Sequence, residues 1–220
     1  TESLLREAAA LGEGNDYIES GGGADIALGG LGHDLIFGGA GNDLLNGGHG
    51  NDIVVGGAGD DTVNTGAGAD WGFGDGTNTL PPVLPTPDNL YQYLIRFSNV
   101  NEGNDTLNLG DGFDYGFGGQ GNDTIHGGGG TDIILGQGGH DYVEAGEGND
   151  GVLGGAGNDV IFGGAGDDIL LGQGGDDGIV GGSGHDDVFG GAGNDWLFGD
   201  GPNTDPDGYT APVAFAQDFG

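Results

Sequence analysis

The chain repeats a nine-residue pattern, and this period constrains its fold more than any other feature of the sequence. Aspartate recurs every nine residues in two series, and a glycine lies two residues before each of these aspartates. Two residues after the aspartate the chain is nearly always aliphatic, as in the units at 38–46 and 154–162. The first series is Asp16, Asp25, Asp34, Asp43, Asp52, Asp61 and Asp70, and the second is Asp105, Asp114, Asp123, Asp132, Asp141, Asp150, Asp159, Asp168, Asp177, Asp186 and Asp195. A sustained short period predicts an architecture of stacked repeats.

The unit resembles the RTX, or hemolysin-type, calcium-binding nonapeptide repeat, whose consensus is Gly-Gly-x-Gly-x-Asp-x-U-x with U a large aliphatic residue. The resemblance covers residues 11–73 and 100–198. It implies an all-β fold, a parallel β-roll related to β-helices, built from 18 units in two arrays with calcium between stacked turns. The second glycine of the unit is replaced at Asn101, Gln137 and Gln173. The aliphatic residue is replaced at Ala27, Gly72 and Gly116, where we expect a thin core.

Elementary backbone chemistry leads to the same architecture. A glycine-rich hexad such as 38–43 suits a turn with positive φ angles, which glycine tolerates. The next three residues suit a short strand, on which Leu45 points to one face while Leu44 and Asn46 point to the other. Two units then close a coil of 18 residues. Stacked coils place Asp34 directly beside Asp52, about 4.8 Å away along the stack.

Stacked carboxylates require a counter-ion, because like charges at this spacing repel strongly in a partly dry site. Ca²⁺ takes six to eight oxygen ligands at about 2.3–2.6 Å, so one ion is suited to the gap between two coils. Mg²⁺ is less suited, since it demands tight octahedral geometry and retains its waters. With one large inward side chain for every nine residues, the core is small, and we expect metal binding to be coupled to folding.

We therefore predict that all 18 aspartates of the two series are metal ligands. The resemblance adds backbone carbonyls at the second and fourth turn positions, namely Gly30, Gly32, Gly39, Gly41, Gly48, Gly50, Gly119, Gly121, Gly128, Gly130, Gly155, Gly157, Gly164 and Gly166. Same-side aspartate pairs, counted in each array separately, predict about 14 calcium ions. The charge of these ions nearly balances the formal net charge of −34.

The sequence divides into five segments. Residues 1–10 suit a short helical cap, 11–79 a first β-roll, 80–99 a proline-rich linker, 100–204 a second β-roll and 205–220 a C-terminal cap or tail. The linker has an alternating stretch at 91–97 that suits an extra strand. Both arrays end alike, in WGFGDGTNT (71–79) and WLFGDGPNT (196–204), which favours a duplicated module and two separate rolls. For Asp75 and Asp200 in these endings, calcium binding and a simple turn role are equally consistent with the sequence.

Apolar side chains are expected to form stripes on the outer face of alternate strands. The first stripe is Tyr17, Leu35, Phe37, Ile53, Val55, Trp71 and Phe73, and the second is Tyr115, Phe117, Ile133, Leu135, Leu153, Ile169, Leu171 and Phe189. Long apolar stripes are unusual on a monomer. We expect the two rolls to pack against each other, or a partner or a second copy to cover the stripes, with solvent-facing strand formers as the alternative.

Charge and composition exclude several classes of protein. With two Lys+Arg against 36 Asp+Glu, the chain is unsuited to nucleic acid and to anionic membrane surfaces. No cysteine is present, so disulfides and thiolate metal sites are absent, and no apolar run is long enough for membrane insertion. His33, His140 and His185 occupy the turn position before aspartate and are interpreted as surface residues. With no H-E-x-x-H or G-x-S-x-G motif, we expect no enzyme activity.

The resemblance also implies where the protein acts. RTX-type proteins leave bacteria by type I secretion, so we expect an extracellular, secreted protein that folds on calcium after export. The function expected is that of a structural, folding and export module. The alternative is a calcium-dependent adhesive, surface-layer or matrix protein that assembles through the apolar stripes.

Overall fold

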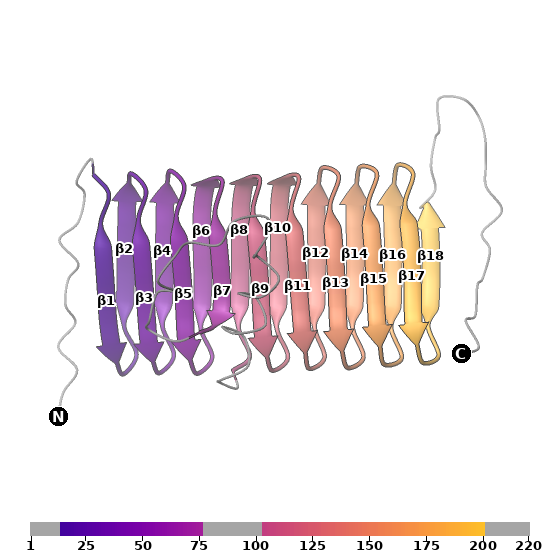
Figure 1. Cartoon of the computed structure of the whole chain (residues 1–220), viewed down its shortest axis with the longest axis horizontal. Coiled ribbons are helices and arrows are strands. Elements are labelled where there is room, and N and C mark those ends of the chain that lie inside the picture. Colours follow the sequence, from indigo (N-terminus) through magenta and orange to yellow (C-terminus); the bar gives the residue numbers. More distant parts are fainter. Residues whose placement is uncertain (1–13, 77–102, 201–220) are drawn as a thin grey trace, which may run out of the picture.

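The computed structural model describes residues 14–76 and 103–200, which form two parallel β-sheets stacked face to face (Figure 1). Each sheet has nine strands, and the chain alternates between them at every turn. Odd-numbered strands form one sheet in the order β1-β3-β5-β7-β9-β11-β13-β15-β17, and even-numbered strands form the other. The prediction of an all-β parallel β-roll is therefore confirmed.

All but two of the strands span six or seven residues, and one strand occurs in each nonapeptide unit. Their bounds are β1 Tyr17–Gly22, β2 Ile26–Leu31, β3 Leu35–Ala40, β4 Leu44–His49, β5 Ile53–Ala58, β6 Thr62–Gly68, β7 Trp71–Asp75, β8 Thr106–Gly112, β9 Tyr115–Gln120, β10 Thr124–Gly130, β11 Ile133–Gly138, β12 Tyr142–Glu147, β13 Gly151–Ala156, β14 Val160–Ala165, β15 Ile169–Gly174, β16 Gly178–Ser183, β17 Asp187–Ala192 and β18 Trp196–Asp200. They are longer than the three residues expected, because the ladder continues through the first glycines of the turn, as in the pairing of Gly39 with Gly57.

The register between neighbouring strands places equivalent residues of successive units side by side. Ile36 pairs with Val54 and Leu45 pairs with Val63, each 18 residues apart. Because side chains alternate along a strand, every aliphatic residue at the U position then points to the same face. Most of these residues are fully buried between the sheets and form one continuous core along the roll, and Ile18, Val188 and Leu197 near its two ends are partly buried.

The two arrays form one roll rather than two, so the expected division into separate rolls at 11–79 and 100–204 is wrong. Strand β6 pairs with β8, with Thr62 opposite Thr106, and β7 pairs with β9, with Trp71 opposite Tyr115. Both sheets therefore continue without a break on either side of the insertion (Figure 1). The similar endings of the arrays therefore do not mark two ends of separate rolls.

The core is not thin at Gly72 and Gly116, contrary to expectation. Leu109 stands where most units have the first glycine, and its side chain points inward and is fully buried. A Cβ added to Gly72 would lie 2.9 Å from Leu109 Cδ2, and one added to Gly116 would lie 2.8 Å from Leu109 Cδ1. The leucine thus fills the space that the two neighbouring glycines leave.

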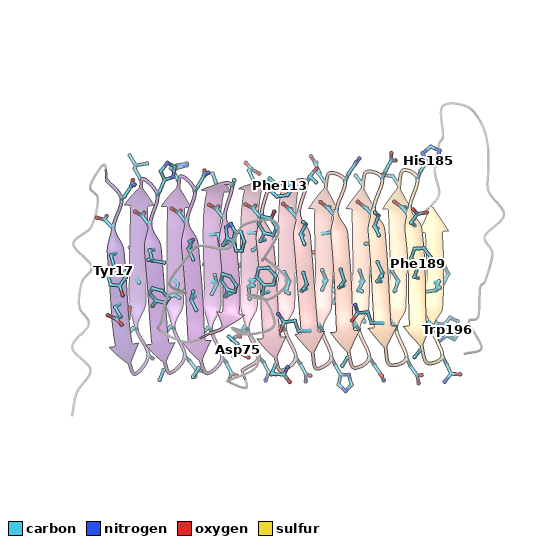
Figure 2. The ribbon with its side chains drawn as sticks, in the orientation of Figure 1. Tyr17, Asp75, Phe113, His185, Phe189 and Trp196 are labelled. Atoms are coloured by element: carbon cyan, nitrogen blue, oxygen red, sulfur yellow. The ribbon has the colours of Figure 1, made fainter. Side chains whose placement is uncertain are left out.

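The outer apolar stripes are only partly exposed. Phe37, Val55 and Phe117 are buried, with 1%, 4% and 1% of their surface exposed, although they lie on the outer face of the odd-strand sheet. In the same stripe Leu135, Leu153 and Leu171 are half-buried. Phe189, near the C-terminal end of the roll, is 57% exposed (Figure 2). The structure therefore does not show a continuous, fully exposed apolar stripe.

Aromatic residues on the outer face gather where the two arrays join. The ring centroids of Trp71 and Tyr115 are 4.5 Å apart, and those of Phe73 and Phe117 are 4.9 Å apart, both in stacked geometry. Such pairs contribute about 0.5–1.5 kcal/mol beyond the area they bury. They strengthen the contact between β7 and β9 across the insertion.

Three predicted elements lie outside the described residues: the helical cap at 1–10, the extra strand at 91–97 and the C-terminal tail at 205–220. Within the described ranges, no helix has the length and apolar character needed to cross a membrane.

Candidate calcium sites

The repeated aspartates form two inner rows, one in the turns at each edge of the roll. After the first aspartate of each row, every carboxylate accepts a hydrogen bond through Oδ1 from the backbone N–H of the aspartate one coil earlier. Asp43 Oδ1 lies 2.8 Å from the Asp25 nitrogen, and Asp52 Oδ1 lies 2.8 Å from the Asp34 nitrogen. The rows continue across the insertion, since Asp105 accepts from Asp61 at 2.7 Å. Predicted stacking at 18-residue spacing is thus present in the structure.

The second carboxylate oxygen, Oδ2, is buried and has no hydrogen-bond partner in most of these residues. The residues are Asp34, Asp43, Asp52, Asp61, Asp70, Asp105, Asp114, Asp123, Asp132, Asp141, Asp150, Asp159, Asp168, Asp177 and Asp195. Buried polar atoms in native proteins almost always have a partner, and an orphaned charged oxygen is especially costly. A row of such atoms indicates that a cation belongs beside them.

Most hexads open with a glycine that makes room for this oxygen, a role that the sequence analysis missed. A Cβ on Gly38 would lie 2.5 Å from Asp43 Oδ2 and 2.6 Å from the carbonyl oxygen of Gly56 in the next coil. The same holds at Gly136, whose Cβ would lie 2.4 Å from Asp141 Oδ2 and 2.6 Å from the Gly154 carbonyl oxygen. A carboxylate oxygen and a carbonyl oxygen therefore share each glycine-lined space. The doubled glycine that opens the unit was the available signal.

The second and fourth glycines direct their carbonyl oxygens along the stack. Gly39 and Gly41 have φ angles of 115° and 125°, a conformation that favours glycine. Their carbonyl oxygens would lie 2.1 Å and 2.5 Å from a Cβ on Gly57 and Gly59 of the next coil. The predicted carbonyl ligands thus point into the space between turns.

Burial makes these carboxylates reluctant to ionise in the absence of a cation. Desolvation raises the pKa of Asp61, Asp114 and Asp141 to about 7, against a usual value of 3.8. Backbone hydrogen bonds lower these pKa values, but neighbouring aspartates raise them further. The pKa of Asp105 reaches about 8, mainly through desolvation and then through the charges of Asp123, Asp61 and Asp75.

The donor set matches Ca²⁺. Each turn supplies one carboxylate and several backbone carbonyls, all hard oxygen ligands of the type Ca²⁺ takes in irregular geometry. Among the described residues, no three His, Cys, Asp or Glu side chains converge to hold a metal, so side chains alone do not build a site. Ca²⁺ would be held by Oδ2 of an aspartate such as Asp43 together with turn carbonyls such as those of Gly39 and Gly41.

An outer row of side chains, also missed from sequence, runs beside each inner row at the position before aspartate. His33 donates its backbone N–H to Asn15 Oδ1 at 3.0 Å, and Asn51 donates its own to His33 Nδ1 at 2.7 Å. At the other edge, His140 Nδ1 accepts the Asn158 N–H at 2.7 Å. These residues are exposed, consistent with the interpretation of the turn histidines as surface residues.

The fold and its turns define a class of protein, a parallel β-roll whose buried, regularly stacked carboxylates are suited to divalent cations. The family model described as the RTX calcium-binding nonapeptide repeat (4 copies) matches eight segments, namely residues 11–36, 28–63, 37–72, 46–80, 100–116, 117–152, 144–179 and 180–201. The chain therefore belongs to the RTX calcium-binding nonapeptide repeat family. A comparison with curated proteins finds no match.

Proposed function

We propose that the protein is a calcium-dependent structural module that folds when it meets calcium outside the cell. The observation that carries this proposal is the row of buried Oδ2 atoms without partners, which like-charge repulsion would destabilise in the absence of a cation. The proposal assigns no catalytic chemistry to the chain. The aspartates of both rows, with the glycine carbonyls of the adjoining turns, are the proposed calcium ligands.

The continuous roll raises the proposed number of calcium ions from about 14 to 16. Counting the arrays separately omits the pairs Asp61 with Asp105 and Asp70 with Asp114, which are joined by hydrogen bonds of 2.7 Å. Nine strands in each sheet give eight same-side pairs at each edge, and thus sixteen gaps between successive turns. Sixteen Ca²⁺ ions carry a charge of +32, close to the −34 of the chain.

Secretion is the second part of the proposal. A chain with this net charge and without bound calcium would remain unfolded at the low calcium level of a bacterial cytosol and travel as an open chain. Extracellular calcium would then drive folding, in the way that metal binding and folding are coupled in other small metal-dependent domains. The absence of cysteine is compatible with this route, since no disulfide has to form.

The test is a far-UV circular dichroism titration of chelator-stripped protein with Ca²⁺, using Mg²⁺ as the control, followed by elemental analysis of the desalted protein. We expect a cooperative change from coil to sheet with Ca²⁺ only, and about 16 bound ions. A sheet signal already present in excess chelator at neutral pH would overturn the proposal.

Assembly through the outer face of the odd-strand sheet is a second candidate function. A shallow pocket there is lined by Leu135, Gln137, Leu153, Gly155, Ala156 and Gln173, and Phe189 is exposed further along the same face. We expect Leu153→Asp to abolish calcium-dependent association in sedimentation velocity, with Val160→Asp on the other sheet as the control. A wild-type protein that stays monomeric at high concentration with calcium would exclude this candidate.

A further inference from the structure

The turn between β7 and β8 differs from every other described turn. Paired aspartates are 18 residues apart along each regular row, but Asp61 and Asp105 are separated by 44. A single turn therefore contains 26 additional residues. Strand β7 ends at Asp75, which is in register with Gly57 and so occupies the second position of the hexad (Figure 2).

Asp75 replaces a backbone carbonyl with its own side chain. In a regular coil, a Cβ on Gly57 would meet the carbonyl oxygen of Gly39 at 2.1 Å. At the interrupted turn, a Cβ on Gly119 would instead meet the Asp75 side chain, with Oδ2 at 2.6 Å. The carboxylate thus lies where the second-position carbonyl of a regular turn would lie.

The backbone hydrogen bonds support this substitution. At the same turn position one coil earlier, the Gly76 N–H donates to the backbone carbonyl oxygen of Gly57 at 3.3 Å, and Gly57 is in register with Asp75. By this pattern the partner of the Gln120 N–H is the backbone carbonyl of Asp75. The Gln120 N–H instead donates to Asp75 Oδ2 at 2.8 Å.

Asp75 also brings a second carboxylate to the site of Asp105. Both residues are buried, each 2% exposed, and Asp105 Oδ2 has no hydrogen-bond partner. That oxygen lies 2.3 Å from a Cβ built on Gly74, the residue before Asp75, and the Gly118 carbonyl oxygen lies 2.5 Å from the same point. The chain's two basic residues, Arg6 and Arg96, lie outside the described ranges.

We propose that Asp75 is a calcium ligand at this junction, sharing an ion with Asp105 and joining the two arrays in register across the insertion. The inference rests on the proposed function, and it adds a ligand that does not belong to the aspartate series of the repeat. A higher ligand charge strengthens calcium binding. The Asp75 carboxylate would therefore compensate for the missing second-position carbonyl, and the junction would still bind a calcium ion.

Hydrogen exchange measured by mass spectrometry at a series of free calcium concentrations tests this inference. Asp75→Asn keeps an oxygen to accept the Gln120 N–H but removes the charge. Asp200→Asn is the matched control, because Asp200 stands in the same Phe-Gly-Asp-Gly motif at the end of β18, the last strand of its sheet. Peptides that cover β8, β9 and β10 are the reporters.

We expect Asp75→Asn to raise the calcium concentration at which these peptides become protected by about tenfold relative to Asp200→Asn. Equal midpoints in the two variants would overturn the inference. Loss of protection that is the same at every calcium concentration would also overturn it, because Asp75 would then act only as a hydrogen-bond acceptor. Failure of the proposed function is distinguishable, since the wild-type protein would then be protected in chelator.

Discussion

The inner and outer rows of the turns use the same hydrogen bond in two different environments. In the inner row Asp141 Oδ1 accepts the N–H of Asp123 at 2.9 Å, and in the outer row Asn158 Oδ1 accepts the N–H of Asp176 at 2.9 Å. Asp141 is buried with a second oxygen that has no partner, whereas Asn158 is exposed to water. Burial, rather than the hydrogen-bond pattern, thus distinguishes the proposed calcium-binding row from the outer row.

The largest effect expected from this difference is a pH dependence of the calcium-free protein. The raised pKa values of the inner row, about 7 for Asp61 and Asp141 and about 8 for Asp105, mean that the folded chain holds more protons than the unfolded chain between about pH 4 and pH 8. Stability without calcium is therefore greatest in acid and falls as the pH rises through this range. In chelator we expect a sheet signal in circular dichroism near pH 5 that disappears near pH 8.

Saturating calcium is the control for this experiment, because Ca²⁺ binds the ionised carboxylates and competes with protons. The calcium concentration needed for folding should fall as the pH rises. A sheet signal independent of pH in chelator would show that the inner row does not limit the fold.

The next largest effect should come from removing one inner charge. Asp141→Asn retains an oxygen for the Asp123 N–H, but it loses the charge that we propose binds calcium. In calcium we expect a loss of about 1–3 kcal/mol in the free energy of unfolding, measured with urea. In chelator the sign should reverse, because the variant removes a buried, repelling charge, so the pH at which the sheet signal disappears should rise.

Asp176→Asn is the matched control for Asp141→Asn, since Asp176 belongs to the outer row, is exposed and accepts the Asn194 N–H at 2.8 Å. Its substitution should change stability little in either condition. Equal effects of the two variants would contradict the distinction between the rows.

A comparable effect is expected from a methyl group placed beside the inner row. The Cβ of Gly136→Ala would lie 2.4 Å from Asp141 Oδ2 and 2.6 Å from the Gly154 carbonyl oxygen, so one of them must move. Overpacking of this kind costs about 1–3 kcal/mol, and it should also weaken calcium binding at this turn. Thermal unfolding in calcium measures the loss. Gly129→Ala, whose nearest neighbour would be Asp111 Oδ1 at 3.5 Å, should leave the unfolding temperature nearly unchanged.

The smallest effect should come from the outer row. Asn158→Ala removes the acceptor of the Asp176 N–H, but water can replace it at this exposed turn. We expect a change within about 0.5 kcal/mol in urea unfolding and an unchanged calcium midpoint. A calcium midpoint that shifts as far as in Asp141→Asn would show that the outer row also binds the ion.

Much of the repeat unit could be predicted from sequence because its determinants are local and recur. Inward Ile36 and Leu45 follow from alternation along a short strand, and stacked Asp34 and Asp52 follow from a coil of two units. The space at Gly38 was missed because it depends on where the carboxylate of Asp43 folds back within the turn. The outer row was missed because Asn and His are ordinary turn residues in the sequence, and the N–H groups that donate to them lie in the next coil.

The sequence by itself determined the period, the parallel roll, the inward aliphatic face and the rows of aspartate, since each follows from nine residues and their neighbours. Only the tertiary structure decided that the insertion leaves the roll continuous, as the pairing of Trp71 with Tyr115 shows. It also decided that Leu109 fills the space beside Gly72 and that Phe117 is buried. These outcomes depend on contacts between coils at positions where the repeat is broken, and a periodic pattern carries no information about its own interruptions.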